Sequence, residues 1–320
     1  MRVNEYKEFV LNGTLLNREQ ALELAEQDVD ELADAADQIR NYFCKNMFDL
    51  CAIINAKSGR CSEDCKYCAQ SIHYRANVTE YPLLSTERLL DAALTHEEKG
   101  IMRFSAVTSG RSLSDAEVDA LTESYREIAG RSGISLCGSH GLLTLEQFIQ
   151  LKQAGLTRYH NNLETSEGYF KKVCTTHTYK EKIAAIQNAQ KAGLEVCSGG
   201  IIGLGEEMKD RIEMALALRE LQIASVPINF LNPIKGTPFE NLPKLSLEEI
   251  RKSIAVFRFI LPKAVLRLAG GRGLLSDQGA CLFRGGANAA ISGDMLTTSG
   301  NGIQEDRKMI ESLGFDLKRL

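Results

Sequence analysis

Apolar and polar residues alternate along most of the chain in blocks of two kinds. Amphipathic blocks with helical periodicity often end at a glycine, and short apolar blocks with β character follow almost at once. The predicted strands lie at 50–56, 101–107, 134–138, 156–160, 194–198, 226–230, 265–268 and 288–291. Capping-box spacing marks helix starts at Ser114/Glu117, Thr144/Gln147, Thr178/Glu181 and Ser246/Glu249, and further helices are expected near 207–220, 247–260 and 304–313. Because strands separated by helices pair in parallel, the pattern predicts an α/β fold, a closed (β/α)8 TIM barrel, with an open doubly wound sheet as the alternative.

The segment before the first predicted strand has a different pattern. Asn17 is a candidate helix cap before the apolar-periodic run that starts at Arg18, and a second amphipathic run covers residues 29–43. We therefore expect an N-terminal helical extension over residues 1–46, packed on the outside of a barrel domain of residues 47–320. No long linker or shift in composition indicates a further domain.

Composition argues against a nucleic-acid-binding, membrane or exported protein and agrees with the predicted fold. Hydrophobic residues make up 44% and charged residues 25% of the 320 residues, which is ordinary globular usage. The net charge of −4 offers no basic surface for nucleic acid or for an anionic membrane. No apolar run approaches the roughly 18 residues of a membrane span, and the N-terminal residues lack the apolar core of a signal peptide. Nine cysteines without an export signal favour reduced thiols and a cytoplasmic location.

The first predicted strand is followed by a cysteine-rich loop at residues 57–72. Cys61, Cys65 and Cys68 have the spacing C-x3-C-x2-C. Their three thiolates are one ligand short of a closed tetrahedral zinc site or a fully ligated 4Fe-4S cluster. A cluster held in this way keeps one iron open for a small chelating molecule. The alternative from spacing alone is a structural zinc knuckle with a distant histidine as the fourth ligand.

This loop resembles the signature of radical S-adenosylmethionine enzymes, in which an aromatic residue such as Tyr67 commonly precedes the third cysteine. The resemblance implies that a 4Fe-4S cluster binds the amino and carboxylate groups of S-adenosylmethionine at its open iron. One electron then cleaves the sulfonium and gives a 5′-deoxyadenosyl radical. The cofactor carries the reaction, and the protein positions and shields it.

A second group of cysteines lies on the predicted strands. Cys51, Cys137, Cys197 and Arg267 fall on strands 1, 3, 5 and 7. Inward side chains of a barrel form layers drawn from alternate strands, so these four side chains are expected to share one layer. We therefore predict a second metal cluster in the barrel interior. The remaining cysteines are interpreted as small buried hydrophobes: Cys44, Cys174 and Cys281.

Over most of its length, from about Phe43 to Leu313, the chain is similar to the biotin synthase family. The similarity rests on five motifs in the same order, at residues 61–71, 159–166, 196–206, 226–238 and 267–272. It implies a radical insertion of sulfur that converts dethiobiotin to biotin, with an auxiliary iron–sulfur cluster as sulfur donor. A related radical enzyme, such as a hydrogenase-cofactor maturase or an amino-acid mutase, would share the cluster loop, but would not explain Asn229 together with the barrel cysteines.

The resemblance also assigns roles to individual positions. The residues implied at S-adenosylmethionine are Tyr67, Asn162, Glu164, Lys182, Gly199, Ile201 and Gly203, with Glu206 completing the last motif. Lys182 stands where the family often has arginine, so a bidentate contact would become a point charge. Asn229 is implied at the ureido ring of dethiobiotin, and His160 takes the other ureido-binding position, where asparagine is common. A hydrogen-bonded histidine without a ligand is the alternative for that position.

One departure from the family pattern concerns the auxiliary cluster. Ser105 stands where well-known members have a cysteine ligand, whereas Cys51 stands where serine is frequent. We hypothesise that Cys51, Cys137 and Cys197 hold the auxiliary cluster, with a 4Fe-5S type favoured. A 2Fe-2S cluster held by the same cysteines and Arg267 is the alternative.

The expected partners follow from the same resemblance. They are dethiobiotin, an electron donor such as flavodoxin or ferredoxin, and a second copy of the chain in a homodimer. Neither a nucleic acid nor a membrane is expected as a partner.

Overall fold

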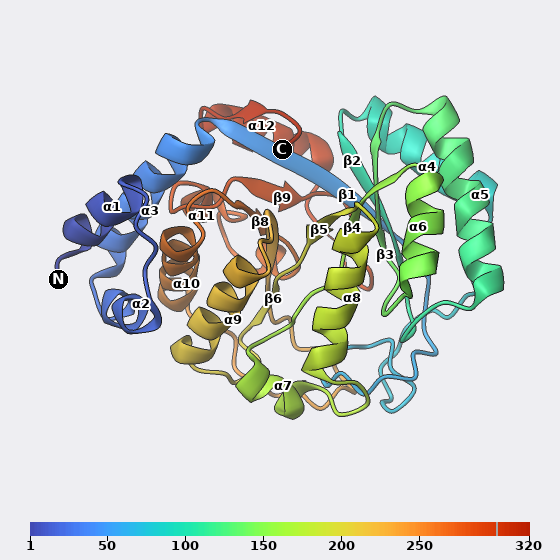
Figure 1. The fold of residues 1–320 in the computed structure, drawn as a ribbon, viewed down its shortest axis with the longest axis horizontal. Helices are drawn as coiled ribbons and strands as arrows, with labels where there is room; N and C mark the ends of the chain where they lie inside the picture. The colour runs from blue at the N-terminus through green and yellow to red at the C-terminus, as the bar shows by residue number, and fades with distance from the viewer. Residues whose placement is uncertain (299) are drawn as a thin grey trace.

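A closed parallel barrel forms the centre of the molecule (Figure 1). The computed structural model describes residues 1–298 and 300–320. The barrel strands are β1 (Met47–Lys57), β2 (Arg103–Thr108), β3 (Ser135–Ser139), β4 (Leu156–His160), β5 (Glu195–Cys197), β6 (Gly200–Ile202), β7 (Ser225–Phe230), β8 (Val265–Leu268) and β9 (Ala289–Ile291). Each strand pairs in parallel with its neighbour, and β9 pairs with β1, where Ala289 lies opposite Asp49. The prediction of a closed barrel is confirmed, and the open doubly wound alternative is wrong because that last pairing removes both sheet edges.

One position of the barrel is occupied by two short strands. β5 pairs with β4 and β7, and β6 continues it along β7 after a break at Ser198 and Gly199. The predicted strand at 194–198 is therefore shorter than expected, and the chain re-enters the sheet at a point that the sequence pattern did not reveal. At the break, Gly199 donates its N–H to the side chain of Asn162, one of the predicted site residues.

Helices cover the outside of the barrel. They are α4 (Thr86–Glu98), α5 (Asp115–Arg131), α6 (Leu145–Gln153), α7 (Glu167–Val173), α8 (Tyr179–Lys191), α9 (Met208–Glu220), α10 (Leu247–Ile260), α11 (Ala280–Phe283) and α12 (Ile303–Ser312), with a short 3-10 turn, η1 (Arg272–Leu274). All four predicted capping boxes are present, for example at Ser114 and Glu117. The helices bury apolar side chains such as Leu121, Phe148 and Ile186 against the strands. Among the described residues, no helix has both the length and the apolar character needed to cross a membrane.

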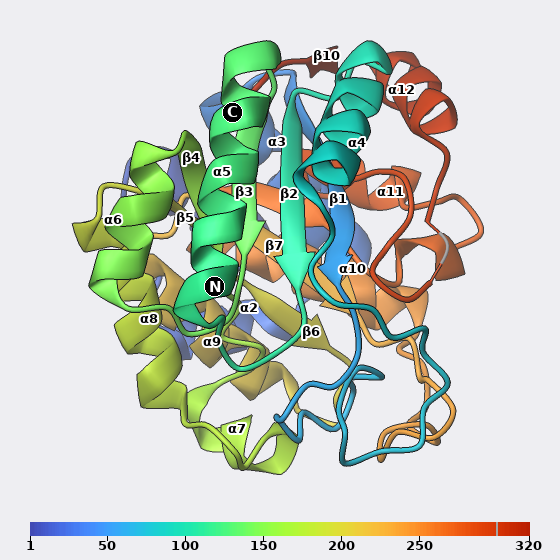
Figure 2. The same ribbon diagram turned by 90° about the vertical axis from the view of Figure 1, so that its right-hand side faces the viewer.

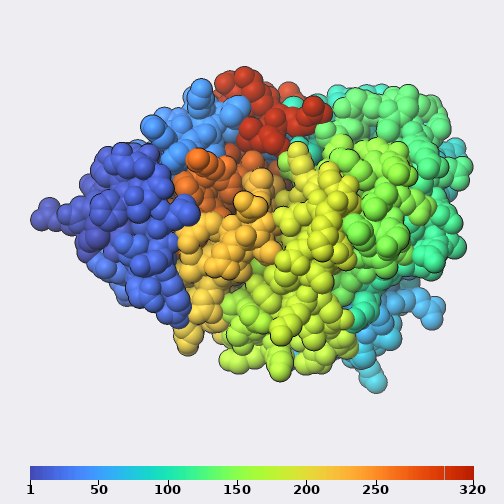
Figure 3. Space-filling view, viewed as in Figure 1, coloured from blue at the N-terminus to red at the C-terminus, as the bar shows by residue number. Residues whose placement is uncertain are grey.

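The N-terminal segment forms three helices beside the barrel: α1 (Val3–Leu11), α2 (Arg18–Ala25) and α3 (Val29–Cys44). The sequence predicted the second and third, but not α1. Tyr6, Leu32 and Ile39 share a separate apolar core with Phe259 of α10, so this lobe packs directly on the barrel helices (Figure 3). The division of the chain at residue 46 stays a prediction.

The last residues return to the start of β1. A two-residue strand, β10 (Asp316–Leu317), pairs with Met47 and Phe48, at the N-terminal end of the barrel strands. Figure 2 places β10 at the opposite end of the barrel from the loop that follows β1. The cysteine loop therefore lies at one end of the barrel, and residues 316–320 lie at the other end.

Candidate radical-cluster and substrate site

A cavity of about 370 Å³ runs through the barrel interior. Its lining begins at Tyr67 and Cys68 in the cysteine loop and extends to Cys51, Cys137 and Arg267 inside the barrel. The cavity therefore connects both cysteine groups that the sequence singled out.

The cysteine loop is held in shape by its own main chain. Cys61 donates its backbone N–H to Gln70 O at 2.9 Å, and Ile72 donates back to Cys61 O at 2.9 Å. Cys68 N donates to Cys65 O, also at 2.9 Å, and the Gln70 side chain accepts from Gly59 N. These bonds fix the three thiols without using their sulfur atoms, which remain available as metal ligands.

The loop thiols raise one another's pKa. Burial raises the pKa of Cys68 to about 11, and the nearby Cys61 adds to the shift. A hydrogen bond with Cys174 and burial raise the pKa of Cys65, with a further contribution from Cys68. Thiolates crowded in this way need a cation between them, and a metal centre that binds thiolates satisfies that need. The donor set therefore fits an iron–sulfur cluster with three protein ligands.

Residues 174–177, which follow α7, form hydrogen bonds to the cysteine loop. Asp64 accepts backbone N–H bonds from Thr175 and Thr176 at 2.7 and 3.2 Å, and Glu63 accepts from His177 at 2.5 Å. Hydrogen bonds from Thr175 outweigh burial and hold the pKa of Asp64 below its ordinary value.

Cys174 belongs to this polar contact rather than to an apolar core. Its sulfur lies 3.2 Å from both Asp64 Oδ1 and His177 Nδ1 and within 4.8 Å of the Cys65 sulfur. The interpretation of Cys174 as a simple small hydrophobe is wrong for that reason. Cys44 is buried with its sulfur near the Arg258 guanidinium, and half-buried Cys281 follows Asp277.

The predicted S-adenosylmethionine residues meet where β4 ends. Asn162 accepts from Gly199 N at 3.1 Å and donates to Glu164 at 3.4 Å. Burial raises the pKa of the Tyr67 phenol, and the Glu164 carboxylate beside it raises that pKa further. Lys182 donates to Asn161 Oδ1 at 2.7 Å. Its ammonium group also lies 4.0 Å from the Glu164 carboxylate and forms an ion pair with it.

The glycines of the β5–β6 segment are required by close approach of the backbone. A Cβ atom on Gly199 would lie 1.9 Å from Pro227 O, and one on Gly200 would lie 2.4 Å from Glu164 O. Gly203 has a φ of 93° and donates its N–H to Glu206 at 2.8 Å. Glu206 also pairs with Arg211 at 2.7 Å, so this carboxylate shapes the loop.

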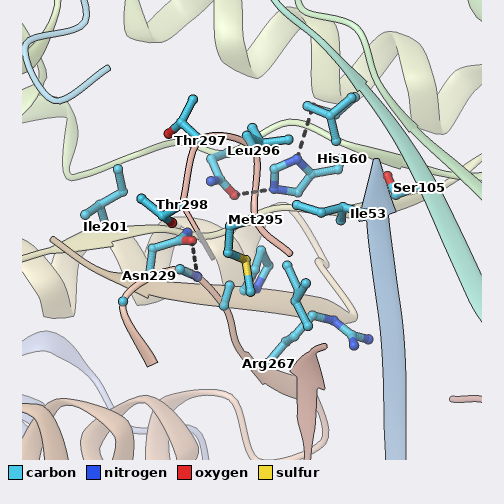
Figure 4. Close-up of a pocket in the computed structure, with 18 of the residues that line it drawn as sticks. Ile53, Ser105, His160, Ile201, Asn229, Arg267, Met295, Leu296, Thr297 and Thr298 are labelled. Carbon is cyan, nitrogen blue, oxygen red and sulfur yellow. Dashed lines mark hydrogen bonds between the residues drawn. The ribbon is translucent and has the colours of Figure 1, made fainter. Parts of the chain in front are cut away.

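His160 and Asn229 extend toward the middle of the cavity (Figure 4). The two ring nitrogens of His160 lie 3.1 Å from Ser139 Oγ and 2.8 Å from Asn162 Oδ1. Asn229 donates to Gly200 O at 3.1 Å and accepts from Gly270 N at 2.9 Å. Each amide or ring is thereby held in one orientation, and the Asn229 amide retains one N–H and one lone pair for a further partner.

Inside the barrel, three cysteines from β1, β3 and β5 line the same cavity. Arg267 Nη1 lies 3.2 Å from the Cys51 sulfur, and Ser225 Oγ lies 3.3 Å from the Cys197 sulfur. Burial raises the pKa of Cys51 to about 12; Arg267 opposes the shift, and Cys137 and Cys197 add to it. The three thiols thus face one cavity and influence the Cys51 pKa, and they are the donors that a shared cluster would use there. Ser105 lines the cavity as well.

Sequence reasoning identified Arg267 but missed the other charged residues around these cysteines. Asp49 is fully buried and lies 3.2 Å from Arg267 and 3.7 Å from Arg103. Burial would raise the pKa of Asp49, but the two guanidinium groups outweigh it and hold the pKa below its ordinary value. Arg158 lines the cavity too, and side-chain nitrogens of all three arginines lack hydrogen-bond partners among the described residues. This positive excess fits an anionic cluster of thiolates, sulfide and iron.

Most of the predicted site residues line the cavity: Cys51, Tyr67, Cys68, Cys137, His160, Asn162, Glu164, Cys197, Ile201, Asn229 and Arg267. Those outside the described lining are Cys61, Cys65, Lys182, Gly199 and Gly203. The lining also includes the segment from Met295 to Thr298, which no motif indicated because it is an irregular loop (Figure 4).

Comparisons with known proteins agree with this geometry. The radical SAM superfamily model matches residues 56–218, and the model of the Biotin and Thiamin Synthesis associated domain matches residues 227–316. Among solved structures, methylornithine synthase superposes with a TM-score of 0.85 at 18% identity, covering 98% of this chain and 97% of the other. The FeFe-hydrogenase maturase from Carboxydothermus hydrogenoformans superposes with a TM-score of 0.82 at 18% identity, covering 98% and 78%. These two likenesses describe the fold alone.

Similarity in sequence is much higher to another group. Biotin synthase from Clostridium botulinum (strain Loch Maree / Type A3) is 56% identical over 98% of both chains. The biotin synthases from Akkermansia muciniphila and Brachyspira hyodysenteriae are 53% and 50% identical, over 97% and 99% of this chain and 96% and 95% of theirs. With this identity along nearly its whole length, and with both family models matched in order, the chain belongs to the biotin synthase family of radical SAM enzymes.

Proposed function

We propose that this enzyme inserts sulfur into dethiobiotin from an auxiliary iron–sulfur cluster held by Cys51, Cys137 and Cys197. The observation that carries the proposal is the single cavity that joins Cys68 of the radical loop to those three buried thiols. When bound, the first cluster supplies the electron that cleaves S-adenosylmethionine, and the second supplies the sulfur atom.

The radical-cluster ligands in this proposal are Cys61, Cys65 and Cys68. Glu164 and Asn162 bind the ribose and the amino-acid part of S-adenosylmethionine, because an ionised carboxylate accepts hydroxyl bonds and an amide both donates and accepts. Ile201 and the glycines beside it let the adenine of S-adenosylmethionine approach the main chain. Tyr67, in the cysteine loop, lines the cavity beside the cofactor.

The substrate lies between the two cysteine groups. Asn229 holds the ureido ring with the N–H and the lone pair that its bonds to Gly200 and Gly270 leave free. His160 reaches the ring by exchanging one of its two hydrogen bonds, to Ser139 or to Asn162, for the substrate. Apolar side chains from Ile53 and Leu296 line the same space and exclude water from it. Exclusion of water protects a carbon radical from side reactions. An unactivated C–H bond has no acidity for a base to use, so positioning is the main task of these residues.

Cys51 replaces the ligand that Ser105 does not provide. The proposed auxiliary cluster is of the 4Fe-5S type, in which one iron carries a sulfide that is not a protein ligand, and Arg267 pairs with the cluster. The support is the Arg267 contact with Cys51 and the unpartnered guanidinium nitrogens around the chamber. A 2Fe-2S cluster with the same cysteines and Arg267 is the second candidate.

The remaining partners are proposed on the family relationship. They are a flavodoxin or ferredoxin as electron donor, a homodimeric assembly and a cytoplasmic location. Sedimentation of the loaded enzyme tests the dimer directly.

The decisive experiment is an anaerobic reaction of enzyme with S-adenosylmethionine, a reductant and dethiobiotin, analysed by mass spectrometry. Biotin formed together with 5′-deoxyadenosine supports the proposal, and a Cys68→Ala variant should form neither. Deoxyadenosine without biotin, from protein whose two clusters were verified beforehand, would show that the substrate assignment is wrong.

A further inference from the structure

We call the end of the barrel at which the strands begin its lower end, or floor, although Figure 2 draws it at the top, and the end with the cysteine loop its upper end. The lower end is closed by a short segment, residues 316–320. After β10, Lys318 donates its backbone N–H to Phe48 O at 2.9 Å, and Leu320 donates to the buried Asp49 carboxylate at 3.0 Å. Figure 2 shows β10 at the end of the barrel away from the cysteine loop. The segment thus crosses the end of the barrel at which the strands begin.

Two buried arginines connect this segment to the cavity. Nη2 atoms of both Arg103 and Arg158 lie 2.9 Å from the Leu320 carbonyl oxygen. Both arginines are only 5% exposed and both line the cavity. Arg103 Nη1 is 3.9 Å from the Cys137 sulfur, so a single side chain separates residues 316–320 from a proposed ligand of the auxiliary cluster.

The floor of the cavity attracts anions. Arg103, Arg158 and Arg267 face one buried carboxylate, Asp49, and Arg103 and Arg158 also share the Leu320 oxygen, which leaves this site when residues 318–320 move away. Glu195, the partner of Arg158, has a side chain that is 62% exposed at the rim. The Nη1 atom of Arg158 has no hydrogen-bond partner among the described residues, and the Nε atom of Arg103 has only an ion pair with the Asp49 carboxylate at 3.7 Å. A small anion on the floor would supply the missing acceptor.

The closing segment itself is held loosely. None of residues 316–320 is buried, and apart from Leu317, which packs against the apolar core, the segment is held by hydrogen bonds to main-chain or polar atoms. Segments with few buried apolar contacts open locally at low free-energy cost.

We propose that residues 316–320 form a stopper over an anion site built by Arg103 and Arg158, and that hydrosulfide reaches the auxiliary cluster through this floor. The inference rests on the proposed function, in which each turnover removes sulfide from that cluster. S-adenosylmethionine and dethiobiotin occupy the upper end of the cavity, so a separate route lets a small anion reach the cluster while they are bound.

The test measures how fast cluster sulfide exchanges with isotopically labelled inorganic sulfide. The enzyme carries its clusters and is kept anaerobic, and no reductant is added. S-Adenosylmethionine and dethiobiotin are added first to fill the upper end, and the label in acid-released sulfide is measured by mass spectrometry. Labelling of the auxiliary sulfide should continue in the filled enzyme. Deletion of residues 318–320 removes several hydrogen bonds at once and should speed it at least about ten-fold, since a single lost bond already changes an opening equilibrium by up to about that factor. Lys318→Ala keeps the backbone N–H and should leave the rate unchanged.

The selectivity of the floor is tested in the same assay. Azide, a small anion, should slow the exchange, whereas acetonitrile, a neutral molecule of similar shape, should not. Exchange that stops when the upper end is filled, or that responds equally to both additives, would overturn the proposal, even if the deletion variant does not fold. Iron and sulfide analysis beforehand separates this result from failure of the proposed function, which would appear as iron for a single cluster only.

Discussion

Cys51 and Ser105 occupy neighbouring strands, and both reach the cavity. Only the thiol can bind iron strongly, and it lies beside the Arg267 guanidinium. Cys51 is therefore the one of this pair that we propose as a ligand of the auxiliary cluster, with Cys137 and Cys197.

Replacing Cys51 with alanine should remove the auxiliary cluster and spare the radical cluster. The expected result is loss of about half of the bound iron, because the radical-loop thiols lie at the other end of the cavity. Iron analysis and Mössbauer spectra of anaerobically loaded protein measure this directly. Cys281→Ala is the matched control, since that residue lies in α11 and is not part of the described cavity lining. Unchanged iron in the Cys51 variant would exclude it as a ligand.

His160 should remain neutral throughout the physiological pH range. Burial lowers its pKa to about 4, and Lys182 and Arg267 contribute in the same direction. Because the folded pKa is below the unfolded value, stability is lost as pH falls from about 6.5 toward the folded pKa, but the ring does not change charge at higher pH. Dethiobiotin affinity measured by anaerobic calorimetry should therefore be constant from about pH 6 to 8. A wild-type inflection near pH 6.5 that is absent from His160→Asn would contradict this.

The elements show which parts of the site could be predicted. Glycine stops, capping boxes and apolar runs gave nearly all strands and most helices, because each is a local signal. Arg103 and Arg158 were not identified, since an arginine within a short strand usually reads as a solvent-facing position. Their burial follows from the closed barrel and from residues 316–320, which are distant in sequence. The break between β5 and β6 and the Met295–Thr298 loop also depend on tertiary contacts.

That break gives a prediction about Gly199. An added Cβ would lie 1.9 Å from Pro227 O, a backbone atom that cannot rotate away. Overpacking costs about 1–3 kcal/mol, so Gly199→Ala should weaken S-adenosylmethionine binding by about ten-fold or more. Equilibrium dialysis of the loaded enzyme measures the affinity.

Gly168 in α7 provides the matched control, because a Cβ there would meet no atom within 4 Å. Gly168→Ala should keep the wild-type affinity and stabilise the helix slightly. Equal affinities for the Gly199 and Gly168 variants would show that the β5–β6 backbone does not shape the cofactor site.

At the scale of the whole molecule, buried ion pairs connect segments that close the barrel. Arg272, which follows β8, pairs with Asp306 of α12 at 2.8 Å, and both side chains are at most 1% exposed. Arg272→Met leaves a buried carboxylate without its partner and should cost about 3–5 kcal/mol of unfolding free energy.

Urea unfolding measures this loss, and the double variant Arg272→Met with Asp306→Leu should recover most of it. A double variant as unstable as the single one would mean that the other contacts of Arg272, to Gln278 O and Ile291 O, provide the stability.

The pairing of β1 with β9 also determines when the site can form during synthesis. Cys51 leaves the ribosome early, but its strand lacks one neighbour until Ala289 to Ile291 have been translated. A nascent chain therefore carries the thiols of the radical loop, Cys137 and Cys197 in an unclosed sheet for most of its translation. Cluster loading into the closed chamber is therefore expected only once residues 289–291 have been made and have paired with β1.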